Sequence, residues 1–221
     1  MNDVIKRSSL DIGTHLSMLV LVCVVPAALS VLWLVVSEFN LGQDRLAHDA
    51  RERTRAVVNA IDREFATVQA AMGGLATSTN ISTGNLALFQ AQASQVLKDL
   101  QDQEVLFSNI VLSDAAGQQL VNTRTEFGTV LPRHGNEALV QKIVSTGLPA
   151  VSDLFTGNVS GVKVVNVGIP IRSGGKVSYV LTAAISTKAI ADVVTRHKFP
   201  ESWIAVVIDS GGTIVARAPP N

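Results

Sequence analysis

The stretch VKVVNVGIPIRSGGKVSYVLTAAIS, residues 162–186, decides the fold class of this chain. Its two halves, Val162–Ile171 and Lys176–Ser186, are rich in the β-branched residues that are typical of strands. They are separated by a glycine pair, Gly174-Gly175, which is the turn chemistry of a tight hairpin. We therefore expect two antiparallel strands here.

Two further hairpins flank this one. Apolar and polar residues alternate in 105–114 and 119–123, on the two sides of a turn at 114–117. The same pattern occurs in 203–209 and 213–217, on the two sides of Gly211-Gly212. Residues 150–155 form one more strand candidate. Consecutive hairpins predict an α+β fold with an antiparallel sheet of about five strands and helices on one face.

Apolar spacing places helices between these strands. Residues 43–78 contain no proline, and Gly73-Gly74 marks where that long helix weakens or ends. A second helix is expected within 80–104, with Ser82 or Thr83 as its cap. Shorter helices are expected at 136–146, closed by Gly147, and at 187–197.

The long helix carries one apolar stripe with alternating spacings of four and three: Thr54, Val58, Ile61, Phe65, Val68, Met72 and Leu75. This 3.5-residue period is that of a coiled coil, so Val58, Ile61, Phe65, Val68, Met72 and Leu75 are candidates for a homodimer seam. The alternative is packing within the chain, against the domain that follows. Both can hold along different parts of one helix.

The run Leu16–Ser37, LSMLVLVCVVPAALSVLWLVVS, contains no charged residue. At about 1.5 Å per residue, such a helix is just long enough to cross a hydrocarbon layer of about 30 Å. The run exceeds the usual apolar core of a cleaved signal peptide, so we expect an uncleaved transmembrane helix. Lys6 and Arg7 before the run are nearly balanced by Arg45 and Arg51 after it. The short tail with its basic pair still favours residues 1–15 on the cytoplasmic side, with the rest of the chain on the other side.

Composition excludes several classes of function. The net charge is zero, which gives no electrostatic basis for nucleic-acid binding. Cys23 is the single cysteine, and the four histidines lack metal-ligand spacing. No nucleophile elbow or phosphate loop is present. We therefore expect neither an enzyme nor a metal or cofactor site in this chain.

The segments SNIVLSDAAGQQLVNTR (108–124), FGTVLPRHG (127–135), 151–186 and WIAVVIDSGGTIVAR (203–217), set behind a membrane helix, resemble a known family. They are similar to the extracytoplasmic Cache (PAS-like, double-Cache) sensor regions of bacterial membrane receptors, most of all those of HWE-type sensor histidine kinases. The resemblance covers roughly residues 16–217. It implies a sensor on the outer side of the bacterial inner membrane that acts as a homodimer.

The same resemblance divides the chain into five parts. These are a tail (1–15), a transmembrane helix (16–37), a signalling helix (38–78), a Cache domain (79–200) and the start of a second, truncated unit (201–221). The last two strands alternatively cap the first domain. A kinase, chemoreceptor or diguanylate cyclase output would lie in sequence beyond Asn221, so the chain would be the front end of a longer receptor.

Pockets of this family lie between the sheet and the loop and helix that cross it, which implies several ligand contacts. Arg124 and Arg133 would hold a carboxylate by paired hydrogen bonds, and Asp153 would hold an ammonium group. Either arginine could instead pair with Asp153. The expected ligand is a small organic acid or an amino acid-like molecule. A membrane-anchored dimerisation module without a ligand is the alternative.

Four more residues complete the candidate site. Asn166 and Thr182 lie in apolar strands, where a polar side chain needs a partner, although Asn166 could also face solvent. Phe127 and Phe155 would either wall the pocket or fill the core. The ligand aromatics usual in this family are scarce, since Tyr179 is the only tyrosine.

Overall fold

The computed structural model describes residues 12–102, 107–200 and 202–219, with the backbone alone for residues 12–17 and 35–46. Most of the predicted tail, residues 1–11, therefore lies outside the described residues. Contacts divide the chain into two compact units, Met1–Thr54 and Arg55–Asn221. The first helix, α1 (Ile12–Ala76), contributes to both.

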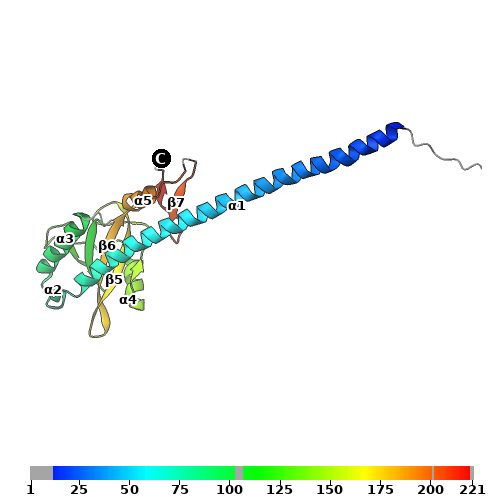
Figure 1. Cartoon of the computed structure of the whole chain (residues 1–221). Coiled ribbons are helices and arrows are strands. Elements are labelled where there is room, and N and C mark those ends of the chain that lie inside the picture. Colours follow the sequence, from blue (N-terminus) through cyan, green and yellow to red (C-terminus); the bar gives the residue numbers. More distant parts are fainter. Residues whose placement is uncertain (1–11, 103–106, 201, 220–221) are drawn as a thin grey trace, which may run out of the picture. The chain divides into compact units, whose positions relative to one another are not determined.

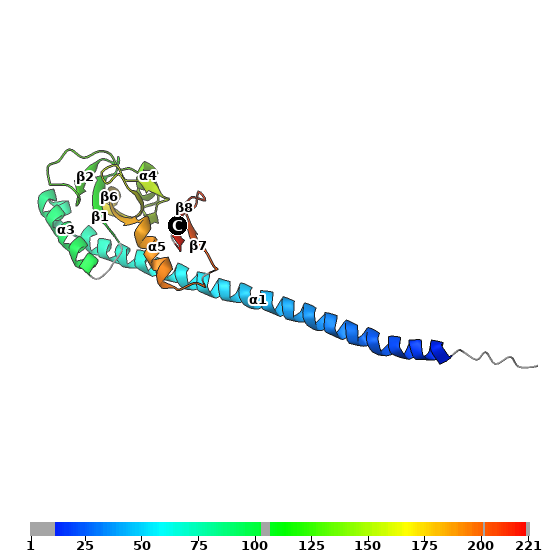
Figure 2. The ribbon, with the colours of Figure 1, turned by 90° about the horizontal axis from the view of Figure 1, so that it is seen from above.

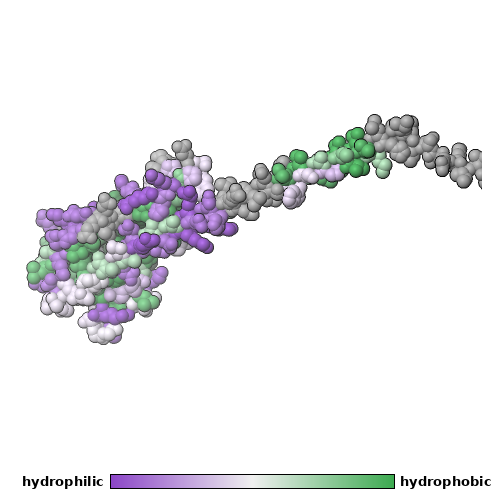
Figure 3. Space-filling view, viewed as in Figure 1, coloured by the Kyte–Doolittle hydropathy of each residue, from purple (hydrophilic) through white to green (hydrophobic). Residues whose placement is uncertain are grey.

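In the first unit, the described side chains of residues 18–34 are all exposed, and Figure 3 shows them as a largely hydrophobic surface. Among the described residues, no helix has both the length and the apolarity needed to cross a membrane. The membrane-spanning helix at 16–37 stays a prediction.

In the second unit, six of the described strands form an antiparallel sheet in the order β2-β1-β6-β5-β3, with β4 also paired to β5 (Figure 1). The strands are β1 (Asn109–Asp114), β2 (Gln119–Asn122), β3 (Ala150–Val151), β4 (Phe155–Thr156), β5 (Lys163–Ser173) and β6 (Lys176–Ser186). The long hairpin of residues 162–186 thus provides two of the central strands. This confirms the predicted α+β fold with an antiparallel sheet.

The strand expected at 150–155 is in fact two short strands. Between them, the backbone N–H of Asn166 donates to the Ser152 hydroxyl at 2.9 Å instead of to a strand carbonyl. The N–H of Leu154 donates to Asp209 at 3.1 Å, outside the sheet. The ladder is interrupted because side chains replace two of its backbone partners.

The helix expected within 80–104 is confirmed, and a separate short helix precedes it. The short α2 (Thr79–Ser82) ends at Thr83, and α3 (Leu86–Asp102) begins after Gly84, whose φ of 73° makes a left-handed turn. Asn85 caps α3 by accepting from the N–H of Leu88 at 3.3 Å, so neither Ser82 nor Thr83 caps it. The helix α1 continues through Gly73-Gly74 and ends at Ala76, close to the predicted end of the long helix at 78.

Helices cover both faces of the sheet, not the single face expected. The C-terminal part of α1, α3 and α5 (Thr187–Arg196) pack on one face, where the main core cluster includes Phe89, Leu112 and Leu181. The helix α4 (Glu137–Thr146) packs on the opposite face through Leu139 and Ile143 (Figure 2). As predicted, Gly147 closes α4 in the left-handed conformation.

The apolar stripe of α1 packs within the chain along its C-terminal half. Val68, Met72 and Leu75 are at most 2% exposed and belong to the main core, and Ile61 and Phe65 pack against its edge. Val58 is 49% exposed, and its neighbour Val57 is buried instead. The dimer seam stays a prediction.

The last hairpin, β7 (Ala205–Ile208) and β8 (Ile214–Ala218), forms a separate two-stranded sheet. Val215 and Ala216 join the main core cluster, and Ala218 packs with Val57 of α1 and Val194 of α5. The hairpin therefore packs on the first domain, as the capping alternative requires. Whether it also begins a second unit stays a prediction.

Candidate functional site

The face of the sheet that α4 covers carries an unusual number of polar residues. The pairing register aligns Asn122, Val111, Thr182 and Gly168 in one row across four strands, and Asn109, Ala184 and Asn166 in the adjacent row. All four polar members are at most 6% exposed. Such positions are normally apolar, because a buried polar group without a partner is costly.

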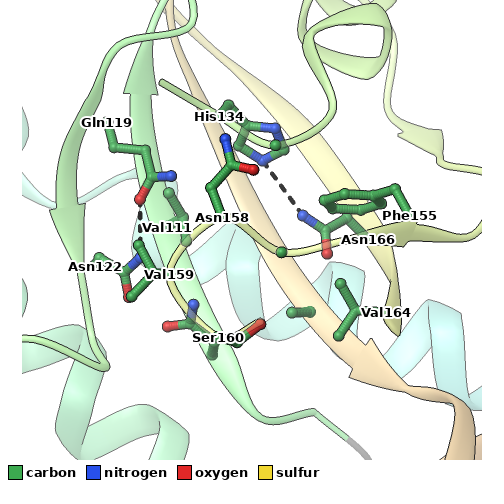
Figure 4. A pocket seen from close by; sticks show the side chains of 14 residues that line it. Val111, Gln119, Asn122, His134, Phe155, Asn158, Val159, Ser160, Val164 and Asn166 are labelled. Atoms are coloured by element: carbon green, nitrogen blue, oxygen red, sulfur yellow. Dashed lines mark hydrogen bonds between the residues drawn. The ribbon is translucent and has the colours of Figure 1, made fainter. Parts of the chain in front are cut away.

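His134 lies over these two rows. It is 3% exposed and lies in the loop that leads from β2 into α4. Its Nε2 atom is 3.2 Å from the hydroxyl of Thr182. The same atom is 3.3 Å from the amide nitrogen of Asn166 (Figure 4). The sheet and the loop thus meet at one imidazole.

The other ring nitrogen of His134 is held by the backbone. Nδ1 lies 3.1 Å from both the carbonyl oxygen and the N–H nitrogen of Asn136, which is the N-cap of α4. Burial lowers the pKa of His134 below its ordinary value of 6.5, and the hydrogen bond to the Asn136 backbone offsets part of that shift. The ring is therefore neutral near neutral pH.

Asn166 has unused hydrogen-bonding capacity. Its Nδ2 faces His134, whereas its Oδ1 is buried and has no hydrogen-bond partner among the described residues. Asn166 is 4% exposed and lines a cavity. A buried acceptor without a donor costs about 1–3 kcal/mol, so the observation calls for an explanation.

A second set of amides ties β2 to the same loop. Asn122 donates to Gln119 Oε1 at 2.8 Å, and Gln119 donates to the carbonyl of Arg133 at 3.3 Å. Asn158 donates to that same carbonyl at 3.0 Å. These bonds fix the backbone of Arg133, the residue before His134, and so hold in place the part of the loop that covers the cavity.

The cavity beneath this loop has a volume of about 30 Å³. Its walls are mostly polar and uncharged, with Phe155 and Val164 adding apolar surface (Figure 4): Asn109, Val111, Gln119, Asn122, His134, Gly135, Phe155, Gly157, Asn158, Val159, Ser160, Val164, Asn166 and Ala184. This volume holds about two water-sized groups. The turn at 157–161 forms one wall of the cavity.

Two of the predicted site residues, Asn166 and Thr182, do come together here, and Phe155 lines the same cavity with its ring 6.1 Å from that of His134. Asn166 is buried, so the solvent-facing alternative is wrong. Phe127 is 53% exposed and lies away from the cavity lining.

The predicted charged residues are not brought together. Arg133 pairs with Glu137 at 2.7 Å and donates to the carbonyl of Ala116 at 2.5 Å, and it does not pair with Asp153. Asp153 accepts from Ser210, and the side chain of Arg124 is exposed. None of these three side chains lines the cavity.

Asp153 instead lines a separate, larger groove of about 330 Å³ between α1, α5, the β3 edge and the β7–β8 hairpin. Its floor is mostly apolar, with Phe65, Ile190 and Val207 among its residues. Asp209, at its rim, has its pKa lowered, first by the hydrogen bond from the backbone of Thr213. The carboxylates here already accept bonds from the hairpin turn.

Sequence reasoning did not select His134, Asn109, Gln119 and Asn122. The signal was present in the strands, where amides at 109, 119, 122 and 166 interrupt apolar runs. The pairing register was needed to show that these amides share one face. His134 was assessed only as a metal ligand; among the described residues, no group of three or more potential ligands could hold a metal ion.

No family model matches the sequence, and no curated protein sequence matches it significantly. Solved structures do match. The sensory domain of chemoreceptor Tlp3 from Campylobacter jejuni aligns with a TM-score of 0.56 at 14% identity, over 76% of this chain and 70% of that one. The ligand-binding domain of amino acid chemoreceptor PctC from Pseudomonas aeruginosa, in complex with GABA, aligns with a TM-score of 0.51 at 13% identity, over 74% and 70%.

A third similar structure is the ligand-binding domain of P. aeruginosa chemoreceptor PctB in complex with L-Gln. It has a TM-score of 0.55 and 14% identity, with 75% of this chain and 65% of that one covered. At such low identity these similarities concern the fold. The chain shares the fold of these sensor ligand-binding domains, in agreement with the fold that the resemblance implies.

Proposed function

We propose that this chain is the ligand-sensing region of a membrane signal-transduction receptor, with the cavity beneath His134 as its ligand site. The observation that carries the proposal is the buried Oδ1 of Asn166, which lines a polar cavity and has no partner among the described residues. Structural stability alone would favour an apolar residue at this position. The similar sensor domains, which bind small molecules such as GABA and L-Gln, support the same class of function.

In this proposal, ligand binding shifts an equilibrium between two arrangements of the cavity wall. The ligand favours whichever arrangement it binds more tightly, and the shift is limited by that difference in affinity. The sensor lies outside the cytoplasm, and α1 passes the change to the inner membrane through the predicted span at 16–37. In this proposal the output domain of the receptor is a histidine kinase, of the HWE type that the sequence resembles. A chemoreceptor or a diguanylate cyclase output is the alternative.

Thermal unfolding of the purified 221-residue chain in detergent tests the ligand site. The panel consists of amino acids, small organic acids and their amides. We expect at least one compound to raise Tm in a concentration-dependent way. The variant Ala184→Leu, which places a larger side chain into the cavity wall, should abolish the shift while the chain remains folded by circular dichroism.

Arg124→Ala is the matched control, because Arg124 is exposed and lies outside the cavity lining. It should leave the shift unchanged. Loss of binding in Arg124→Ala but not in Ala184→Leu would instead favour the arginine-based site that the sequence predicts. No response to any compound would contradict ligand sensing and favour a dimerisation module without a ligand.

A further inference from the structure

The cavity beneath His134 is polar without being charged. The polar side chains that line it are the amides of Asn109, Gln119, Asn122, Asn158 and Asn166, the imidazole of His134 and the hydroxyl of Ser160. No Asp, Glu, Lys or Arg is among its described lining residues. A ligand group in this cavity would therefore contact neutral polar groups and no charged side chain among these lining residues.

The charged side chains of Arg133 and Asp153 bind partners outside the cavity. The guanidinium of Arg133 binds Glu137 and the Ala116 carbonyl, so Arg133 presents its backbone carbonyl to the amide network. Asp153 faces Ser210. A carboxylate or an ammonium group that entered the cavity would lose hydration without gaining a counter-ion, which is unfavourable.

Asn166 sets the hydrogen-bonding pattern that the ligand must match. With Nδ2 toward His134, the free atom is the acceptor Oδ1, which requires a donor from the ligand. In the alternative orientation of the same amide, the free atom is Nδ2, which requires an acceptor. A carboxamide satisfies both cases, because it carries a donor and an acceptor side by side.

The size of the cavity is consistent with a small head group. A volume of about 30 Å³ holds about two water-sized groups, which is close to the oxygen and nitrogen of an amide. The remainder of the ligand would lie beneath the turn at 157–161. That turn is held by two backbone bonds, from Gly157 to the Val162 carbonyl at 3.0 Å and from Gly161 to the Gly157 carbonyl at 2.8 Å.

On the basis of the proposed ligand-sensing function, we propose that this site selects an uncharged, amide-like group over a carboxylate or an ammonium group. The class includes carboxamides, ureas and lactams. It differs from the zwitterionic ligands that the sequence-based expectation and the similar chemoreceptors suggest.

Three probes of nearly equal shape test this selection: benzamide, benzoate and benzamidine, which are neutral, anionic and cationic at pH 7.5. Binding to the full chain in detergent is measured by ligand-observed NMR, with empty micelles as the blank. We expect benzamide to bind at least tenfold more tightly than either ion. Asn166→Asp places a carboxylate in the cavity wall and should reverse the preference toward benzamidine.

Arg124→Ala serves as the control and should keep the wild-type order. Equal or tighter binding of benzoate or benzamidine to the wild-type chain would overturn the neutral selection, as would binding of benzamide that Asn166→Asp leaves unchanged. Failure of all three probes would also overturn it. If a charged compound from the wider panel then shifts Tm and loses that effect in Ala184→Leu, the sensing function stands and only the ligand class is wrong.

Discussion

The carboxylate of Asp153 accepts hydrogen bonds from both the backbone N–H and the hydroxyl of Ser210, 57 residues further along the chain, at 3.0 and 2.7 Å. The adjacent Asp209 accepts from the N–H of Leu154 at 3.1 Å. These reciprocal bonds attach the break between β3 and β4 to the turn of the β7–β8 hairpin. Phe155, which follows Leu154 in the sequence, lines the cavity. The short segment 153–155 therefore links the cavity wall to the hairpin.

Removing the Ser210 hydroxyl should loosen this attachment. In Ser210→Ala, Asp153 loses the hydroxyl bond but keeps the backbone one. Because the contact is exposed, we expect the free energy of unfolding to change by less than about 1 kcal/mol. Hydrogen exchange at residues 205–218 should nevertheless become faster. Ser173→Ala, at another exposed hairpin end, is the control, and unchanged exchange in Ser210→Ala would contradict the attachment.

The buried imidazole of His134 predicts an acid-sensitive fold. Burial lowers its pKa below 6.5, so between the folded pKa and 6.5 the unfolded chain binds more protons than the folded chain. The resulting stability is fully present above pH 6.5 and is lost as the pH falls through that window. Urea unfolding at pH 7.5, 6.5 and 5.5 should show a decreasing midpoint.

His134→Gln isolates this contribution, because glutamine does not titrate and all other groups are unchanged. The variant should show a smaller loss of stability between pH 7.5 and 5.5 than the wild type. An identical pH dependence in the two proteins would mean that the stability loss comes from other groups.

Gly168 allows α4 to pack closely on the sheet. A Cβ at this position would lie 2.5 Å from Cδ1 of Ile143 and 3.2 Å from Cγ2 of Thr182. We expect Gly168→Ala to destabilise the protein by about 1–3 kcal/mol through overpacking. Ile143→Val removes the clashing methyl group at a cost of about 0.5–1.5 kcal/mol. The double variant should be more stable than the sum of the two losses; simple additivity would contradict the clash.

The glycines of α1 and of the following turn should respond oppositely to alanine. A Cβ at Gly73, within α1, meets no atom within 4 Å, so Gly73→Ala should stabilise the helix by about 0.5–1 kcal/mol. Gly84 is equally open but has a φ of 73°, so Gly84→Ala should destabilise. Thermal unfolding of both variants checks the sign. Stabilisation by both changes would contradict the left-handed turn.

Much of the fold could be predicted because local pattern and tertiary structure agree along the hairpins. The glycine pair at 174–175 and the alternation on both sides of it specify β5 and β6 without any long-range information. The errors occur where distant side chains supply backbone partners. Asp209 takes the N–H of Leu154, and no local pattern in residues 150–155 reveals that bond.

The site was harder to predict for the same reason. Asn166 and Thr182 could be selected singly, as polar residues in apolar strands, but His134 comes from a loop and meets Thr182 across 48 residues. Arg124 and Arg133 were selected because a guanidinium can bind a carboxylate. Arg133, however, already pairs with Glu137, which lies close to it in the sequence. The pairing register of the strands decides which polar residues lie on the same face. A single sequence does not show this register directly.

The dimer seam predicted along α1 can use only part of its stripe. Val68, Met72 and Leu75 are enclosed by the chain's own core, so they are not available to a second copy, whereas Val58 is 49% exposed. If α1 pairs with its copy, Val58→Glu should weaken the dimer in sedimentation equilibrium while leaving the unfolding midpoint of the monomer nearly unchanged. Met72→Ala is the matched contrast, because it should cost about 2–5 kcal/mol of stability without changing the association constant of the folded chain. An unchanged dimer in Val58→Glu would place the contact between copies elsewhere, and α1 would then serve the fold of its own domain alone.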